Sequence, residues 1–150
     1  MRVIIQRVST AGVTIPEERY TAEIHNGLVI LLGIKEDDKE EDAIYLADKC
    51  INLRIFEDEK SKMNRSLADV NGEILVISQF TIYGDATRGN RPNFGEAAKP
   101  ETAIPLYKKF ISRLKFNLGD EKVKAGIFGA KMTVDIRNEG PVTITIDSKR

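Results

Sequence analysis

The most constraining feature of the chain is the stretch EILVISQFTIYG at residues 73–84, in which an apolar run passes without a break into polar residues. Residues 74–77 are continuously apolar, which predicts a strand covered on both faces. Ser78, Gln79 and Thr81 follow almost directly. A polar group that is buried without a partner costs about 1–3 kcal/mol. The stretch therefore predicts either a turn that closes the strand or a functional site at the end of a core strand.

The apolar pattern predicts one α/β domain that spans residues 1–150. We expect a mostly antiparallel, barrel-like sheet, because hairpin signals outnumber strand–helix–strand crossovers. One such signal is Asn26-Gly27, which favours a type I′ hairpin. Two main helices against the sheet are expected near residues 41–53 and 102–114, where apolar residues recur at helical spacing. The expected strands are residues 2–15, 20–25, 28–34, 74–77, 122–127, 132–137 and 142–147.

The charge balance limits the partners of the chain. Lys and Arg total 23 and Asp and Glu total 23, so the net charge is zero. A non-specific nucleic-acid binder usually carries an excess of basic residues, so contact with RNA would need a local patch and a shaped pocket. The single cysteine excludes an intrachain disulfide and favours a reducing compartment. Without a signal-peptide pattern or an apolar run of 18 residues, a cytoplasmic protein with no membrane span is expected.

Few residues offer the chemistry of common catalytic sites. His25, the only histidine, lies beside the predicted hairpin turn, and Cys50 belongs to the apolar stripe of the first helix. A His-based triad or a Cys–His pair is therefore not expected. The sequence contains no cluster with metal-ligand spacing and no glycine-rich nucleotide motif, so neither a metal nor a cofactor is expected. Polar and backbone groups remain near Ser78 and at the Gly140-Pro141 corner, where they can orient a substrate but provide no general base.

Three arginines stand in positions that need an explanation. Arg7 lies inside the first predicted strand, where its guanidinium either reaches water along an apolar surface or pairs within a cleft. Arg88 and Arg91 lie in residues 85–100, a long segment without periodicity that also carries Phe94. Such a segment is either a solvated surface loop or a functional one. Two arginines close to an aromatic residue favour phosphate or base contact.

Several sequence blocks along the chain resemble one protein family. The blocks are MRVIIQRVSTAGV at residues 1–13, NLRIFEDEKSKMN at 52–64, SQFTIYG at 78–84, RPNFGEAAKPE at 91–101 and NEGPVT at 138–143. Together they closely resemble the D-aminoacyl-tRNA deacylase family, of the D-tyrosyl-tRNA deacylase type, over essentially the whole chain. The resemblance implies a homodimeric editing enzyme. It would hydrolyse the ester that joins a D-amino acid, or glycine, to the 3′-terminal adenosine of a tRNA.

The resemblance also implies which residues form the pocket. The terminal adenosine and the aminoacyl group would be bound by Ser78, Gln79, Phe80 and Thr81, with main-chain donors among them. Phe128 and Met132 match residues near the same pocket. The ribose 2′-hydroxyl of the tRNA is thought to assist catalysis in the family, which agrees with the lack of a general base.

Other matched residues would act outside that pocket. Gly140 and Pro141 match a Gly-cisPro motif that enters the active site of the other subunit and crowds the position of an L side chain. Arg7 matches the arginine that holds this motif in place. The loop RGNRPNF at residues 88–94 departs from the family pattern near Asn90 and Asn93, but its Arg88 and Arg91 would still contact the tRNA. A rigid backbone segment of this kind can reject one enantiomer by steric clash, although both enantiomers carry the same groups.

Three alternative functions remain open at the level of the sequence. One is a non-catalytic module that holds the acceptor end of tRNA, which the missing general base favours. Another is an esterase with Thr81 as the nucleophile, although no neighbouring base would activate its hydroxyl. The third is a hydrolase of small D-amino-acid esters that needs no RNA.

Overall fold

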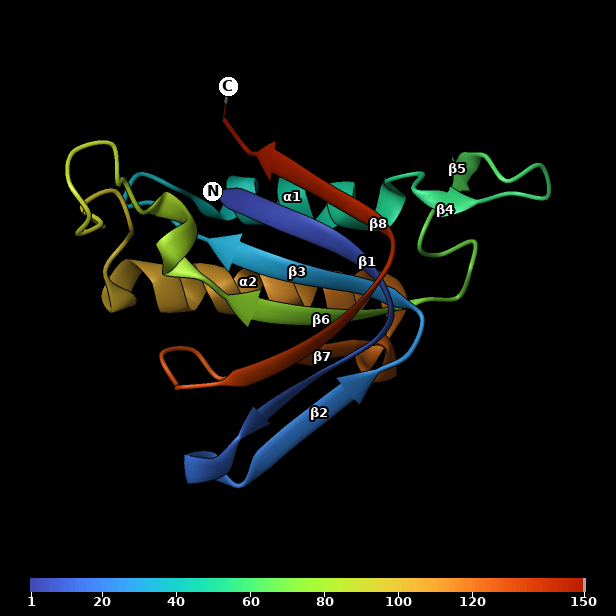
Figure 1. Cartoon of the computed structure of the whole chain (residues 1–150), viewed down its shortest axis with the longest axis horizontal. Coiled ribbons are helices and arrows are strands. Elements are labelled where there is room, and N and C mark those ends of the chain that lie inside the picture. Colours follow the sequence, from blue (N-terminus) through green and yellow to red (C-terminus); the bar gives the residue numbers. More distant parts are fainter. Residues whose placement is uncertain (150) are drawn as a thin grey trace.

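The computed structural model of the protein describes residues 1–149 and shows a curved sheet with two long helices on one side (Figure 1). The helices are α1 (Glu40–Asn52) and α2 (Pro100–Leu118). The sheet contains β1 (Arg2–Ile15), β2 (Tyr20–Ile24), β3 (Gly27–Gly33), β6 (Glu73–Ser78), β7 (Val123–Ala125) and β8 (Thr133–Asp147). The short elements are the hairpin β4 (Phe56–Glu57) and β5 (Met63–Arg65), and the 3-10 turns η1 (Pro16–Glu18), η2 (Phe80–Tyr83) and η3 (Asp120–Lys122).

The sheet is mixed rather than mostly antiparallel, which corrects the expectation from the sequence. β1 pairs antiparallel with β2, β3 and β8, whereas β3 with β6 and β6 with β7 pair parallel. Parallel neighbours need a crossover connection. The segment with α1 and the β4–β5 hairpin leads from β3 to β6, and α2 leads from β6 to β7. The Tyr20 hydroxyl of β2 donates to the Ala125 carbonyl of β7 at 2.7 Å, so the sheet forms a nearly closed barrel.

The predicted hairpin at Asn26-Gly27 is wrong. β2 and β3 do not pair with each other, because both pair with β1, through its residues 11–15 and 2–8 respectively. Neither residue of the predicted turn has a positive φ. A Cβ atom at Gly27 would lie 1.8 Å from the carbonyl oxygen of Glu73. A glycine is therefore required at this position by the close approach of β6. It is not required by a turn.

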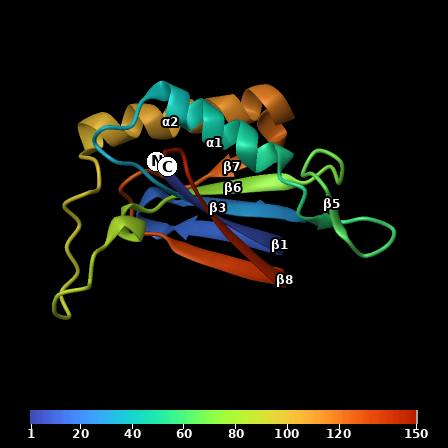
Figure 2. The ribbon, with the colours of Figure 1, turned by 90° about the horizontal axis from the view of Figure 1, so that it is seen from above.

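β6 is covered on both faces, as its apolar run predicts. Ile74 and Val76 belong to the core between the sheet and the helices, while Leu75 and Ile77 belong to a second cluster inside the barrel. This division follows from the alternation of side chains along a strand. Figure 2 shows both helices on the same side of the sheet. Packing on two sides fixes the carboxyl end of β6, which is where the polar residues of the stretch begin.

Both predicted helices are present, with a different start for the second. α1 buries the expected Cys50 in the core. α2 starts at Pro100 rather than near Thr102, whose hydroxyl donates to a carboxylate oxygen of Glu36 at 2.6 Å. Within residues 1–149, neither helix combines the length and the apolarity needed to cross a membrane.

Candidate active site

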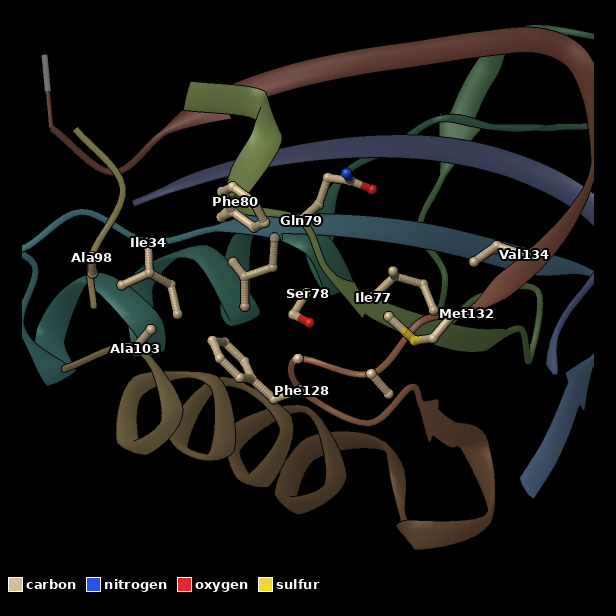
Figure 3. Close-up of a pocket in the computed structure, with 13 residues that line it drawn as sticks. Ile34, Ile77, Ser78, Gln79, Phe80, Ala98, Ala103, Phe128, Met132 and Val134 are labelled. Carbon is tan, nitrogen blue, oxygen red and sulfur yellow. The ribbon is translucent and has the colours of Figure 1, made fainter. Parts of the chain in front are cut away.

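A cavity of about 290 Å³ opens where the parallel strands β3 and β6 end (Figure 3). Ligands of α/β sheets commonly bind at the carboxyl ends of parallel strands, because strand ends and the following turns converge there. Its lining comes from these two strand ends, the start of α2 and the segment around the start of β8. The lining residues are Leu32, Ile34, Ile77, Ser78, Gln79, Phe80, Ala98, Ala103, Phe128, Gly129, Ala130, Met132 and Val134.

The polar end of the stretch is both a turn and part of the cavity lining. Ser78 ends β6, and the N–H of Gln79 donates to the Leu32 carbonyl at 2.8 Å, which extends the contact with β3 by one residue. The chain then turns through η2. Phe80 stands beside the cavity with 55% of its surface exposed (Figure 3). The hydroxyl of Thr81 lies outside the lining, where it accepts a hydrogen bond from the side-chain amide of Gln79.

Two adjacent main-chain donors at the start of η2 are unpaired. Among residues 1–149, the N–H groups of Phe80 and Thr81 find no acceptor, whereas the N–H of Ile82 donates to the Gln79 carbonyl. The first N–H groups of a helical turn have no partner inside that turn. A pair of such donors can stabilise a negatively charged oxygen. The turn thus leaves two N–H groups of this kind at and beside Phe80, which lines the cavity.

No titratable side chain lines the cavity, since Ser78 and Gln79 supply its only polar side chains. His25 Nδ1 lies 3.2 Å from Oε1 of Glu73, which begins β6 at the end away from the cavity. Cys50 is fully buried, and this burial raises the pKa of its thiol to about 12, so it is a packing residue. In the part of the chain that the structure describes, no group of three or more His, Cys, Asp or Glu residues could hold a metal ion. The cavity therefore contains no general base of its own.

The segment between β7 and β8 forms one side of the cavity and is tied to α2. The Tyr107 hydroxyl of α2 donates to the Gly126 carbonyl at 2.8 Å. The Tyr107 ring also packs against Phe128, with 5.7 Å between the ring centroids. A Cβ atom at Gly126 would lie 2.5 Å from the sulfur of Met132, so the glycine allows this methionine to fold back towards the cavity. These contacts fix the position of the two predicted pocket residues in this segment.

Arg7 and the Gly140-Pro141 corner lie together, apart from the cavity of their own chain. The register of β1 with β8 shifts here, so that residues 139–142 bulge opposite Arg7. The peptide bond at Gly140-Pro141 is cis. Arg7 is 4% exposed, and its guanidinium donates to the carbonyls of Ile55 at 2.7 Å and Glu139 at 3.2 Å. Of the two interpretations of this arginine, the structure thus favours pairing within the fold over a head group in water.

Arg88 and Arg91 are exposed on the loop between η2 and α2, outside the cavity lining. Asp85 and Asn93 close the base of this loop through two main-chain hydrogen bonds of 2.8 Å. Figure 2 shows the loop projecting from the body of the molecule. The arginines are therefore exposed residues of this loop and are not part of the cavity lining.

The cavity unites some of the predicted site residues and not others. Those that line it are Ser78, Gln79, Phe80, Phe128 and Met132, and those outside it are Thr81, Arg7, Gly140, Pro141, Arg88 and Arg91. Sequence reasoning missed the other lining residues. Leu32 and Ile34 could have been found from the apolar run LVILLGI, had its parallel alignment with β6 been recognised. Gly129 and Ala130 carry no comparable signal, because small residues in a loop have no periodicity.

Comparison with known proteins places these features in a family. The family model described as D-Tyr-tRNA(Tyr) deacylase matches residues 4–147. A D-aminoacyl-tRNA deacylase of Flavobacterium psychrophilum is 55% identical over 149 residues, which cover 99% of this chain and 98% of that protein. The protein of the same name from Thermosipho africanus is 52% identical over 151 residues, covering 100% of this chain and 99% of the relative.

Two solved structures are similar to this chain in fold. The c-Myc DNA unwinding element binding protein has a TM-score of 0.92 with this chain, at 38% identity and 100% coverage of both chains. A probable eukaryotic D-amino acid tRNA deacylase has a TM-score of 0.85 at 17% identity, covering 97% of this chain and 98% of its own, and shows the shared fold. Because the family model matches residues 4–147 and relatives of about half-identical sequence cover 99–100% of the chain, the chain belongs to the D-aminoacyl-tRNA deacylase family of ester hydrolases.

Proposed function

We propose that the chain hydrolyses the ester that joins a D-amino acid, or glycine, to the 3′-terminal adenosine of tRNA, and leaves L-aminoacyl-tRNA intact. The observation that carries this proposal is the cavity at the end of β6. It combines the polar groups of Ser78 and Gln79 with two unpaired N–H groups and has no general base. Such a site suits a reactive ester that brings its own catalytic group.

The chemistry fits assistance by the substrate. An aminoacyl ester is already activated, so orientation and stabilisation of the developing oxyanion can supply much of the rate. Ser78 and Gln79 orient the terminal nucleoside and the aminoacyl group, and the N–H groups of Phe80 and Thr81 donate to the oxyanion. The ribose 2′-hydroxyl, next to the ester, positions the attacking water. The protein thus needs no base among its own side chains.

Selection of the D enantiomer is assigned to the Gly140-Pro141 corner of a second subunit. The corner is exposed and does not line the cavity of its own chain. Arg7 ties it to the main chain at Ile55. A main-chain segment held in this way cannot swing aside as a side chain does, so it can exclude an L side chain by clash. Glycine carries no side chain to exclude and passes the same barrier.

This proposal describes a homodimer of single-domain chains, spanning residues 1–150, that acts on tRNA in the cytoplasm without a cofactor. The dimer is needed because each cavity requires the corner of the other chain. The molecule as a whole has no net charge, so the exposed Arg88 and Arg91 provide the local positive charge that contacts the tRNA.

Deacylation of matched substrates tests the proposal. D-tyrosyl-tRNA and glycyl-tRNA should be hydrolysed, while L-tyrosyl-tRNA should survive. Replacing the terminal adenosine by 2′-deoxyadenosine should slow hydrolysis strongly without weakening tRNA binding. Equal stability of the D and L substrates in the presence of folded dimer would contradict the activity. An unchanged rate with the deoxy substrate would contradict only the role of the 2′-hydroxyl.

A non-catalytic module that holds the acceptor end of tRNA is the second candidate. The absence of a general base among the cavity-lining residues favours it. The same assay separates the two functions, because a binding module would retain the aminoacylated tRNA with its ester intact.

A further inference from the structure

Two phenylalanines form an exposed aromatic pair at the mouth of the cavity. Phe80 is 55% exposed and Phe94 is 36% exposed. Their ring centroids lie 5.1 Å apart in an edge-to-face arrangement with 73° between the planes. Only Phe80 lines the cavity, so Phe94 extends an aromatic surface from the cavity outward. Aromatic surface left open to water beside a pocket is a candidate for ligand contact.

The ring of Phe94 is held in place by the loop around it. Its neighbour Asn93 exchanges two main-chain hydrogen bonds of 2.8 Å with Asp85, and the Asn93 side chain accepts the N–H of Gly95 at 2.9 Å. A Cβ atom at Gly84 would lie 2.8 Å from the Phe94 ring, so the glycine lets the ring lie close to the chain. Both sides of this loop therefore position the ring, although it is partly exposed.

The tip of the same loop is positively charged. Residues 86–95 contain Arg88 and Arg91 and no acidic residue. Within residues 1–149, the arginines that form ion pairs are Arg2, Arg7, Arg65 and Arg113, so neither arginine of the tip is neutralised by a carboxylate. A fixed aromatic ring next to cationic side chains is the combination by which proteins hold single-stranded nucleic acid, through base stacking and phosphate contact.

We propose that Phe94, supported by Phe80, is a stacking subsite for the nucleotide that precedes the terminal adenosine of a single-stranded RNA 3′ end. Arg88 and Arg91 contact the phosphates on either side of it. The inference rests on the proposed function, because the terminal nucleoside must occupy the cavity for the preceding one to lie at its mouth. RNA is favoured over an apolar peptide because the loop that carries the ring also carries Arg88 and Arg91, neither of which has a carboxylate partner among the described residues, while the flanking Glu96 pairs with Lys35.

The test compares a substrate that has the nucleotides before the terminal adenosine with one that lacks them. One is D-tyrosyl-tRNA, and the other is D-tyrosyl-adenosine, which ends where the cavity ends. Phe94→Ala should raise KM for the tRNA about tenfold and leave kcat unchanged, since stacking on an aromatic side chain contributes about 1–3 kcal/mol per base. With D-tyrosyl-adenosine the same variant should match the unmodified protein.

Two control variants separate stacking from other effects, and two arginine variants test the phosphate contacts. Phe94→Tyr keeps the ring and should restore the KM for tRNA. Phe116→Ala removes a phenylalanine of α2 that is 80% exposed, and it should leave the KM for both substrates unchanged. Arg88→Gln and Arg91→Gln should each reduce the slope of log affinity against log salt by about 1.

Two results would overturn the subsite. An equal loss on both substrates would show that Phe94 only supports the loop, and no loss on the tRNA would show that the ring does not stack. Binding of an uncharged RNA oligonucleotide, which needs no hydrolysis, keeps this result distinct from a failure of the proposed function. Phe94→Ala should weaken that binding about tenfold, whether or not the protein proves to be a deacylase.

Discussion

Arg7 is a buried guanidinium whose contacts are main-chain carbonyls rather than a close carboxylate. Its nearest acid, Glu57, lies 4.0 Å away with its side chain 56% exposed. Arg7→Ala should lower the free energy of unfolding by about 2–3 kcal/mol, because the buried Ile55 carbonyl loses its donor. Under the proposed function it should also let L-tyrosyl-tRNA react. Urea unfolding and the ratio of D to L hydrolysis rates measure the two effects.

Arg7→Lys is the matched control, since it keeps the charge but has a single donor nitrogen in place of the guanidinium. It should fall between Arg7→Ala and the unmodified protein in both measurements. A stable Arg7→Ala protein with unchanged selectivity would show that the arginine does not position the corner.

The hydroxyl of Thr81 has a partner that cannot activate it. The side-chain amide of Gln79 donates to this hydroxyl and takes no proton from it. Thr81→Ala should therefore keep kcat/KM within about tenfold, whereas loss of a true nucleophile costs many orders of magnitude. Single-turnover deacylation of D-tyrosyl-tRNA, with Thr81→Ser as the control, measures the difference. A drop beyond about 10⁴-fold, restored by serine, would instead favour a threonine nucleophile.

At the scale of elements, Tyr107 joins α2 to the segment that forms one side of the cavity. Burial raises the pKa of its hydroxyl, which therefore stays protonated and donates to the Gly126 carbonyl at working pH. Tyr107→Phe should cost about 1–2 kcal/mol of stability, because that carbonyl is left without its donor. As a positioning residue it should raise KM for D-tyrosyl-tRNA more than it lowers kcat. Tyr45→Phe, on the exposed face of α1, is the control and should change neither the stability nor the KM for D-tyrosyl-tRNA. If it changed them as much as Tyr107→Phe does, the positioning role of Tyr107 would be contradicted.

A bidentate ion pair joins the two helices. Asp48 of α1 accepts from Nε and Nη2 of Arg113 at 2.7 and 2.8 Å, and Asn117 adds a bond of 2.9 Å. The hydrogen bonds from Arg113 hold the pKa of Asp48 below its ordinary value. The stabilisation is therefore present above the unfolded-state pKa of about 3.9 and is lost as pH falls through the lower folded-state pKa.

Asp48→Asn should accordingly destabilise the protein at pH 7 by at most about 1 kcal/mol, because the pair is one-third exposed. The difference from the unmodified protein should shrink below about pH 4, where the carboxylate becomes protonated. Urea midpoints measured across pH 3–7 test this behaviour. Glu40→Gln, which removes a single contact of 3.2 Å to Lys109, should have a smaller effect. A penalty for Asp48→Asn that is as large at pH 3 as at pH 7 would show that packing rather than charge is lost.

The elements also show what could be predicted from the sequence and what could not. The apolar run 74–77 was assigned correctly, because local periodicity records burial on each face of a strand. The hairpin predicted at Asn26-Gly27 is wrong, because the glycine at position 27 is required by a close contact with Glu73, which is far away in the sequence. Ser78 could be singled out as a polar residue ending a core strand. Ala130, which also lines the cavity, follows the crossover through α2 and leaves no local sequence pattern.

At the scale of the whole molecule, the cavity and the corner belong to different places in one chain. The corner sits opposite Arg7 on the bulge of β8, and it does not line the cavity. If the corner selects the substrate, it must do so in a neighbouring chain, so each site of a dimer would depend on both subunits. Two variants separate the halves. Ala130→Trp fills the cavity and leaves the corner intact, while Arg7→Ala loosens the corner and leaves the cavity intact.

Mixed dimers of these variants test the arrangement. In a heterodimer, the open cavity of the Arg7→Ala chain faces the intact corner of the Ala130→Trp chain. Co-purification with a growing excess of Ala130→Trp should therefore return the D to L ratio towards that of the unmodified protein. The control partner carries both substitutions and should restore nothing, because its corner is loosened as well. A ratio that stays at the Arg7→Ala value in every mixture would place the corner in its own chain's site and contradict selection across subunits.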